Sequence, residues 1–150
     1  MKLKIPPAVQ TLIFAAFMWL INQYSSIGNF SFIHQKTLAT IVFIIGSFIA
    51  VIAVVQFISA KTTSDPMHPS KAAQLVTNGI YNYSRNPMYL AILVVLISWM
   101  LVLGNFFNLI IVGIFIWYIT KFQIKPEEEA LIKLFGNKYV DYCNHVRRWI

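Results

Sequence analysis

Three long stretches of this 150-residue chain carry no Lys, Arg, Asp or Glu: they run from Ile5 to Gln35, from Thr37 to Ala60 and from Asn86 to Thr120. A helix needs about 20 mostly apolar residues to cross the hydrocarbon core of a bilayer, so each stretch can hold at least one span. Only 11% of the residues are charged and 58% are hydrophobic, whereas soluble domains have roughly 25% charged residues. This composition excludes an ordinary soluble globule and a disordered chain. It predicts a small integral membrane protein with one domain, residues 1–150.

The charge-free stretches predict four transmembrane helices and an all-α fold. The third stretch is too long for one crossing of a hydrocarbon core about 30 Å thick. Gly104 and Asn105 lie near its middle, where a break between two helices is natural. We therefore expect spans near residues 8–24, 38–58, 87–103 and 106–120, the last two forming a helical hairpin. Amphipathic helices are expected to follow at 126–148.

The basic residues predict how these spans are oriented. With four spans, Lys2 and Lys4 lie on the same side as the polar segments at 61–86 and 121–150. All of the 12 Lys and Arg residues except Lys36 then fall on that side, together with the five acidic residues. Because cytoplasmic loops are enriched in Lys and Arg, we expect both termini to be cytoplasmic, in a prokaryotic plasma membrane.

Lys2 and Lys4 before an apolar run could also mark a secretory signal peptide. The run ends in Asn22-Gln23-Tyr24 and contains no small-x-small cleavage motif at that point. We therefore favour a retained first span.

Several other classes of function are excluded by the sequence. The net charge of +7 is explained by basic loops that meet anionic lipid head groups, and no nucleic-acid-binding motif accompanies it. His34, His68 and His145 are far apart and lack the spacing of metal ligands, so we expect no metal. Cys143 is the only cysteine, which excludes an internal disulfide.

The first polar segment ends at the start of the third predicted span. Asn86 and Pro87 are typical of the N-cap and first residue of a helix. The free N–H groups at that end favour an anionic ligand, and Arg85 adds a guanidinium that can bind an anion through two hydrogen bonds. An ordinary helix start with an Arg reaching the membrane surface has the same pattern.

The second polar segment carries three consecutive glutamates. Pro126 is typical of a helix start, and Glu127, Glu128 and Glu129 occupy the first turn, where the helix dipole favours carboxylates. Gly136 is expected to end this helix, after which tyrosines recur at helical spacing. The simplest alternative is a pair of amphipathic helices lying on the membrane surface.

In series, the two segments resemble the isoprenylcysteine carboxyl methyltransferase family. The first carries LVT-x-G-x-Y and then R-N-P-x-Y, at Leu75–Tyr81 and Arg85–Tyr89. The second carries EE-x-x-L and then FG-x-x-Y-x-x-Y-x-x-x-V-x-R, from Glu127 to Arg148. The resemblance covers about residues 62–149 with order and spacing kept. Phospholipid N-methyltransferases share a related C-terminal layout.

The resemblance implies S-adenosyl-L-methionine as methyl donor, and S-adenosyl-L-homocysteine as product, bound between the third span and the C-terminal helices. Position by position, it implies these cofactor-binding residues: Gln74, Leu75, Val76, Gly79, Tyr81, Asn86, Pro87, Met88, Tyr89 and Glu127. Many members have His where this chain has Asn86. Members that methylate prenylcysteine tend to have Arg where this chain has Gln123, which is therefore the substrate-binding candidate.

The catalytic candidates are Arg85, to orient an anion, and Glu128, to support the electrostatics. Because the donor is already activated, methyl transfer needs mainly proximity, alignment and a dry site. A carboxylate or thiolate acceptor needs no general base. We therefore expect carboxyl O-methyltransfer to a lipophilic or prenylated acceptor that arrives from the membrane lipids. The alternatives are a phospholipid or other small-molecule N- or S-methyltransferase, and a non-catalytic membrane scaffold subunit.

Overall fold

The protein folds into a bundle of helices, seen here in a computed structural model that describes residues 6–25, 27–59 and 75–150. The helical segments of these residues are α1 (Pro7–Tyr24), α2 (Gln35–Ser59), η2 (Gly79–Asn82), α3 (Pro87–Leu103), α4 (Asn108–Ile119), η3 (Thr120–Ile124), α5 (Lys125–Phe135) and α6 (Asn137–His145). No strand occurs in the described ranges, where Asn29 and Asn105 form a single isolated bridge. The predicted all-α class is confirmed.

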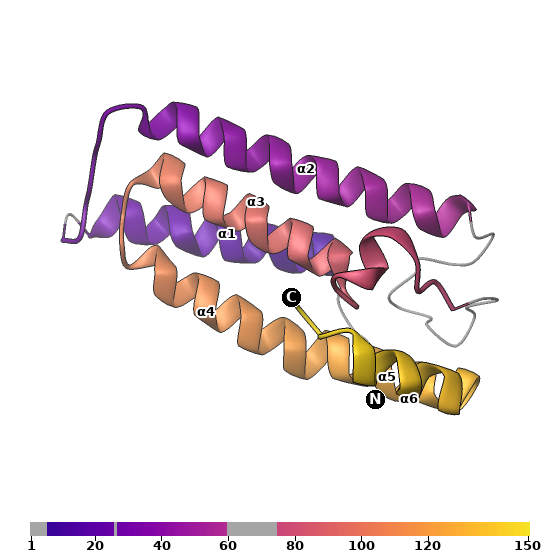
Figure 1. Ribbon diagram of the computed structural model, residues 1–150. Coiled ribbons are helices and arrows are strands. Elements are labelled where there is room, and N and C mark those ends of the chain that lie inside the picture. Colours follow the sequence, from indigo (N-terminus) through magenta and orange to yellow (C-terminus); the bar gives the residue numbers. More distant parts are fainter. Residues whose placement is uncertain (1–5, 26, 60–74) are drawn as a thin grey trace.

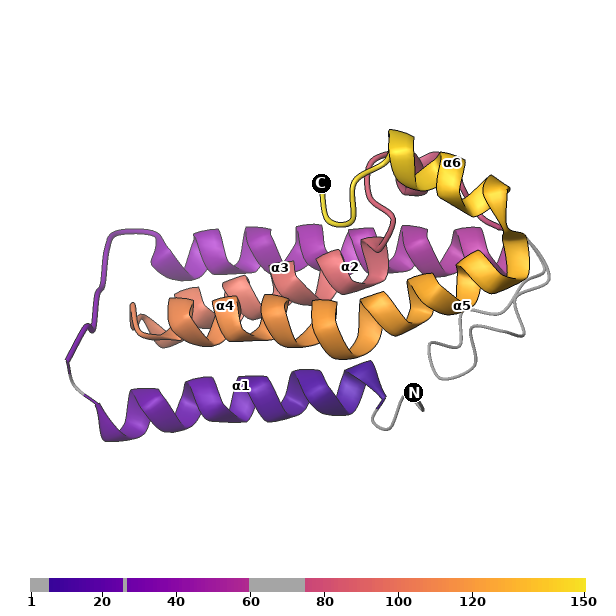
Figure 2. The ribbon, with the colours of Figure 1, turned by 90° about the horizontal axis from the view of Figure 1, so that it is seen from below.

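Helix α3 occupies the centre of the bundle. It packs against α1, α2 and α4, and α3 and α4 lie between α1 and α2 (Figure 2). The four long helices begin and end within three residues of the expected segments. The apolar stretches of the sequence therefore correspond to the long helices of the bundle.

The break between α3 and α4 occurs at Gly104 and Asn105, as expected. Gly104 adopts φ +64°, and a Cβ there would lie 2.6 Å from the carbonyl oxygen of Phe30, so a residue with a side chain is strongly disfavoured. Asn105 is fully buried. Its Nδ2 donates to the carbonyl oxygen of Ile27 at 3.2 Å and to Oδ1 of Asn29 at 2.8 Å. These bonds tie the α1–α2 connection to the α3–α4 hairpin.

Helices α2 and α3 approach each other closely at Gly46. A Cβ on Gly46 would lie 3.0 Å from Cγ2 of Val95 and 3.1 Å from Cγ1 of Val94. The hydroxyl of Ser98 donates to the carbonyl oxygen of Ala39 at 2.8 Å across the same interface. Small residues and interhelical hydrogen bonds of this kind hold helices together inside a bilayer, where lipid removes the hydrophobic drive for association.

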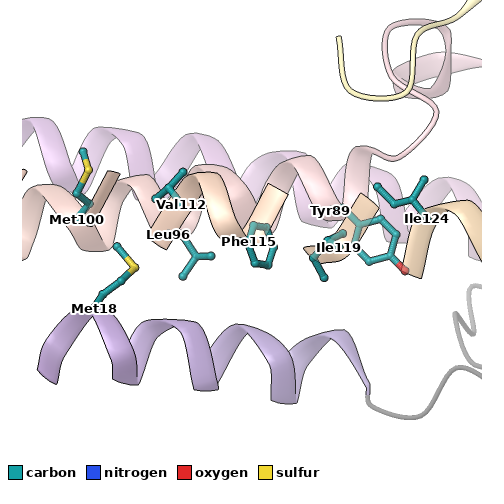
Figure 3. Packing of buried hydrophobic residues seen from close by; sticks show 8 residues of the cluster. All are labelled: Met18, Tyr89, Leu96, Met100, Val112, Phe115, Ile119 and Ile124. Carbon is teal, nitrogen blue, oxygen red and sulfur yellow. The ribbon is translucent and has the colours of Figure 1, made fainter. Parts of the chain in front are cut away.

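A buried core joins α1, α3, α4 and η3 (Figure 3). Its members are Met18, Tyr89, Leu96, Met100, Val112, Phe115, Ile119 and Ile124. Tyr89 is the only one with a polar tip, and it lies at the end of the core next to α5 (Figure 3). The core therefore holds a hydroxyl at one defined end of the bundle.

The outer faces of the bundle are apolar. In α2, Ile44, Phe48 and Val51 each leave more than half of the side chain exposed. Two helical stretches are long and apolar enough to cross a membrane, α2 and the continuous helix Asn108–Phe135, and α3 is apolar but shorter. Water disfavours contiguous exposed apolar surface of this extent, so these faces fit a lipid environment.

One expectation about the second half of the chain was wrong. We expected a gap between the fourth span and a new helix starting at Pro126, but α4, η3 and α5 form one continuous helix. The reason is the π-helical turn η3, in which the N–H of Lys125 bonds to the carbonyl oxygen of Thr120. The chain passes into α5 through this wider turn without a break. The last helix also ends at His145, earlier than the expected residue 148.

Candidate functional site

A partly buried carboxylate, that of Glu127, lies at the end of the bundle where α3 begins. The hydroxyl of Tyr89 donates a hydrogen bond to its Oε1. Nε2 of Gln123 donates to the same oxygen at 3.0 Å. Burial raises the pKa of Glu127 to about 7, although the bonds from Tyr89 and Gln123 act in the opposite direction. The carboxylate therefore changes charge near neutral pH and is held by two neutral donors.

The local fold explains how these three groups meet. Tyr89 lies in the first turn of α3, two residues after Pro87. Gln123 belongs to the π turn and Glu127 to the first turn of α5, so they are four residues apart on the same continuous helix. Residues at that spacing share a helix face, and this face is directed towards α3. A π turn inside an α-helix is frequent at functional sites.

The next glutamate along the chain makes different contacts. Glu128 accepts from Nε and Nη2 of Arg148 at 3.0 and 2.7 Å, and its Oε1 lies 3.2 Å from Nη2 of Arg85. Only 11% of the Glu128 side chain is exposed, and only 10% of that of Arg85. A carboxylate shared by two guanidinium groups is held in one geometry. We call Arg85, Glu128 and Arg148 the charged clasp.

The C-terminal residues are fixed over the start of α3 by further bonds. The backbone N–H of Arg85 donates to the carbonyl oxygen of Arg147 at 3.0 Å. Nδ2 of Asn86 donates to the carbonyl oxygen of Arg148 at 2.9 Å. Asn86 therefore occupies the N-cap position as predicted, but its side chain makes no capping bond. The α3 N-terminus is covered by the end of the chain.

A tyrosine cluster, formed by the buried residues Tyr81, Tyr139 and Tyr142, adjoins the charged clasp. The hydroxyl of Tyr142 donates to the carbonyl oxygen of Tyr81 at 2.6 Å. Tyr81 is itself 4% exposed, and its hydroxyl is buried without a hydrogen-bond partner among the described residues. Burial raises its pKa, and the charge of Glu127 adds to this effect. The cluster and the carboxylate therefore lie close enough to interact electrostatically.

Glutamine 56 of α2 holds the short helix η2 in place. Its Oε1 accepts from the N–H of Ile80 at 3.2 Å. Gly79 adopts φ +61°, and a Cβ there would lie 1.8 Å from Nε2 of Gln56. The left-handed backbone at residue 79 favours glycine, and a Cβ there would displace the Gln56 amide that bonds Ile80. Gln56 was not identified from the sequence.

Most of the predicted residues fall into three groups in the structure. Tyr89, Glu127 and Gln123 form one hydrogen-bonded set, whereas Leu75, Val76, Tyr81 and Met88 belong to or pack against the tyrosine cluster. Arg85 and Glu128 are ion-paired with each other. Pro87 is buried at the start of α3. Gln74 and His68 lie outside the described residues.

Sequence reasoning missed the residue that completes the first group. Gln10 in the first turn of α1 is 5% exposed, and its Nε2 donates to Oε1 of Gln123 at 3.4 Å. An amide near the start of a mostly apolar helix was the signal that could have revealed it.

In the described residues these features define an all-helical, apolar bundle with a partly buried carboxylate site at one end, and comparisons with known proteins place it in a family. The phospholipid methyltransferase family model matches residues 34–138. The chain belongs to this family.

The curated relatives agree with the resemblance noted from the motifs. A protein-S-isoprenylcysteine O-methyltransferase of Schizosaccharomyces pombe is 29% identical over 118 residues, which are 79% of this chain and 50% of that protein. One from Dictyostelium discoideum is 41% identical over 72 residues, 48% of this chain and 30% of that protein. An uncharacterized protein of Haemophilus influenzae is 46% identical over 63 residues, 42% of this chain and all of that protein. The chain thus spans half or less of the length of the named relatives, and its similarity to isoprenylcysteine methyltransferases is confirmed.

Proposed function

We propose that this protein transfers a methyl group from S-adenosyl-L-methionine to a lipophilic acceptor at the cytoplasmic face of a membrane. The observation that carries the proposal is the Glu127 carboxylate, which is partly buried and bonded to Tyr89 and Gln123 at one end of a bundle whose long helices are almost free of charge. A buried charge is costly and persists where it has a function. Membership of a methyltransferase family supplies the class of reaction.

The residues around Glu127 fit the proposed donor. The hydrogen bonds from Tyr89 and Gln123 go to Oε1, and in this proposal Oε2 accepts from ligand hydroxyls or an ammonium group. The hydroxyl of Tyr81, which has no hydrogen-bond partner within residues 6–25, 27–59 and 75–150, offers a second polar contact. Val76 and Met88, at the adjoining cluster, provide apolar surface for the rest of the molecule.

The donor, when bound, supplies an activated methyl group on a sulfonium. The protein's own residues hold the donor and orient the acceptor. Glu127 and Tyr89 form the cofactor contact. Arg85 and Glu128, which we named as catalytic candidates, are tied to each other and to Arg148. In this proposal the clasp keeps the end of the chain over the α3 N-terminus, and Arg85 still presents the positive charge that orients an anionic acceptor.

The topology belongs to the same proposal. Four spans, formed by α1, α2, α3 and α4, put Lys36 on one side of the membrane and Arg85 with the clasp on the other. The positive-inside rule then makes the clasp side cytoplasmic. The membrane part of the long helix ends before Lys121, so Glu127 lies beyond the hydrocarbon core.

Two candidate functions differ in the group that accepts the methyl: a carboxylate or a phospholipid amine. The named curated relatives favour a carboxylate acceptor, and the description of the matched family model favours a phospholipid. We would incubate the purified protein in lipid nanodiscs with methyl-labelled donor and either phosphatidylethanolamine or a prenylated cysteine. Base-labile label in the prenylated product indicates a methyl ester, and base-stable label in the lipid indicates N-methylation. Absence of label in both, with label also absent from a total lipid extract, would contradict the proposal.

A further inference from the structure

The first helix adds a polar side chain to the site from outside the region that the family model matches. Residues 34–138 are matched, whereas Gln10 lies in α1. The start of α1 lies beside the junction of η3 and α5 (Figure 2). There Gln10 is almost completely buried, so its amide needs hydrogen bonds to offset the loss of water. The bond to Gln123 provides one.

The direction of the hydrogen bonds gives this contact a consequence for Glu127. The Gln123 amide has one accepting end and one donating end. Because Nε2 of Gln10 donates to Oε1 of Gln123, the NH₂ end of Gln123 is the end that faces Glu127. A reversed Gln123 amide would bring its oxygen against the carboxylate, which is unfavourable. With Gln10 donating, the Gln123 amide is therefore held in the orientation in which it supports Glu127.

We propose that Gln10 is a positioning residue for the cofactor site, acting through Gln123 to hold the Glu127 carboxylate in its binding orientation. The inference rests on the proposed function and extends it to a residue of the first helix. It makes α1 part of the site as well as part of the bundle.

The test measures S-adenosyl-L-homocysteine affinity by calorimetry on the full chain in detergent. Gln10→Met keeps the length of the side chain but removes its donor, and one hydrogen bond predicts a roughly three- to tenfold weaker affinity. Gln23→Met is the matched control, because Gln23 is an exposed residue of the same helix; its affinity is expected to equal that of the wild type. Melting temperatures establish that each variant is folded.

Two further variants separate positioning from general stability. If Gln10 acts through Gln123, the double variant Gln10→Met, Gln123→Met binds no more weakly than Gln123→Met alone. In Gln10→Glu the ionised carboxylate can only accept a hydrogen bond. It therefore favours the reversed Gln123 amide, whose oxygen faces Glu127, and we expect this variant to bind S-adenosyl-L-homocysteine more weakly than Gln10→Met. It also serves as the second variant if Gln10→Met does not fold.

The outcomes distinguish this inference from the function on which it rests. Wild-type affinity in folded Gln10→Met, or additive losses in the double variant, would overturn the role of Gln10 while leaving the methyl donor site intact. A folded wild-type protein that binds no S-adenosyl-L-homocysteine would overturn both.

Discussion

Replacing Glu128 by alanine is expected to destabilise the protein far more than replacing Arg148, its more exposed partner in the clasp. The change leaves Arg85 buried, with 10% of its side chain exposed and without its counter-ion. Nε of Arg85 already has no hydrogen-bond partner among the described residues, so the remaining contacts cannot compensate. Removing one partner of a buried pair costs about 3–5 kcal/mol. Arg148→Ala, at a side chain that is 33% exposed, leaves Glu128 paired and should cost on the order of 1 kcal/mol.

Thermal unfolding in detergent, followed by tryptophan fluorescence, measures the difference. For a chain of this size 1 kcal/mol corresponds to a melting-temperature shift of about 2–4 °C, so Glu128→Ala should lower the melting temperature by at least about 6 °C. Glu129→Ala is the matched control, because Glu129 is an exposed carboxylate in the same segment. The reasoning is refuted if Glu128→Ala and Glu129→Ala melt at the same temperature.

Three further predictions concern the cofactor site, the contact between α2 and α3, and the α3–α4 hairpin. Burial raises the pKa of Glu127 from 4.5 to about 7, so between these values the folded protein keeps a proton that the unfolded chain has lost and stability falls as pH rises; Glu127→Gln should abolish this fall in melting scans from pH 4.5 to 8. Gly46→Leu forces side-chain atoms against Val95 and should lower the melting temperature more than Gly113→Leu, where a Cβ meets nothing within 4 Å. Asn105→Ala removes the donor that binds Asn29 and should cost about 1–3 kcal/mol of unfolding free energy, measured by denaturant titration; an unchanged midpoint would contradict the role of this residue.

The broad fold was predictable because its causes are local. Charge-free stretches show where helices can be surrounded by lipid, and Gly104 shows where one must end, since the left-handed conformation it adopts suits glycine. The π turn at Thr120–Ile124 was not predictable, because the choice between bond registers depends on what packs against the helix. For the same reason the helix break expected at Pro126 did not occur.

The candidate site was predictable in composition and not in arrangement. Glu127, Glu128 and Glu129 are equivalent in the sequence, as a first turn favoured by the helix dipole. Successive residues point about 100° apart around a helix, so each meets a different environment once α3 and the C-terminal residues are in place. Glu127 meets Tyr89, Glu128 meets two arginines, and Glu129 faces outward. Only tertiary packing separates their roles.

Polar residues inside apolar helices were the signal that sequence analysis passed over. Gln10 and Gln56 are amides that lie among apolar residues in α1 and α2, and neither belongs to a motif. In the fold one contacts Gln123 and the other Ile80, so both brace the end of the bundle that carries Glu127. Such residues are costly in an apolar helix unless they are bonded, and their presence alone predicts a partner.

The central claim is that Glu127 belongs to a cofactor site, and one titration tests it most directly. Calorimetry would compare S-adenosyl-L-homocysteine binding to the wild type, Glu127→Gln and Glu129→Gln, all shown to be folded by their melting curves. We expect saturable binding by the wild type and by Glu129→Gln, and roughly tenfold or weaker binding by Glu127→Gln, because a hydrogen bond to a charged group is lost. Equal affinity in the three proteins, or no binding by the folded wild type, would contradict the account.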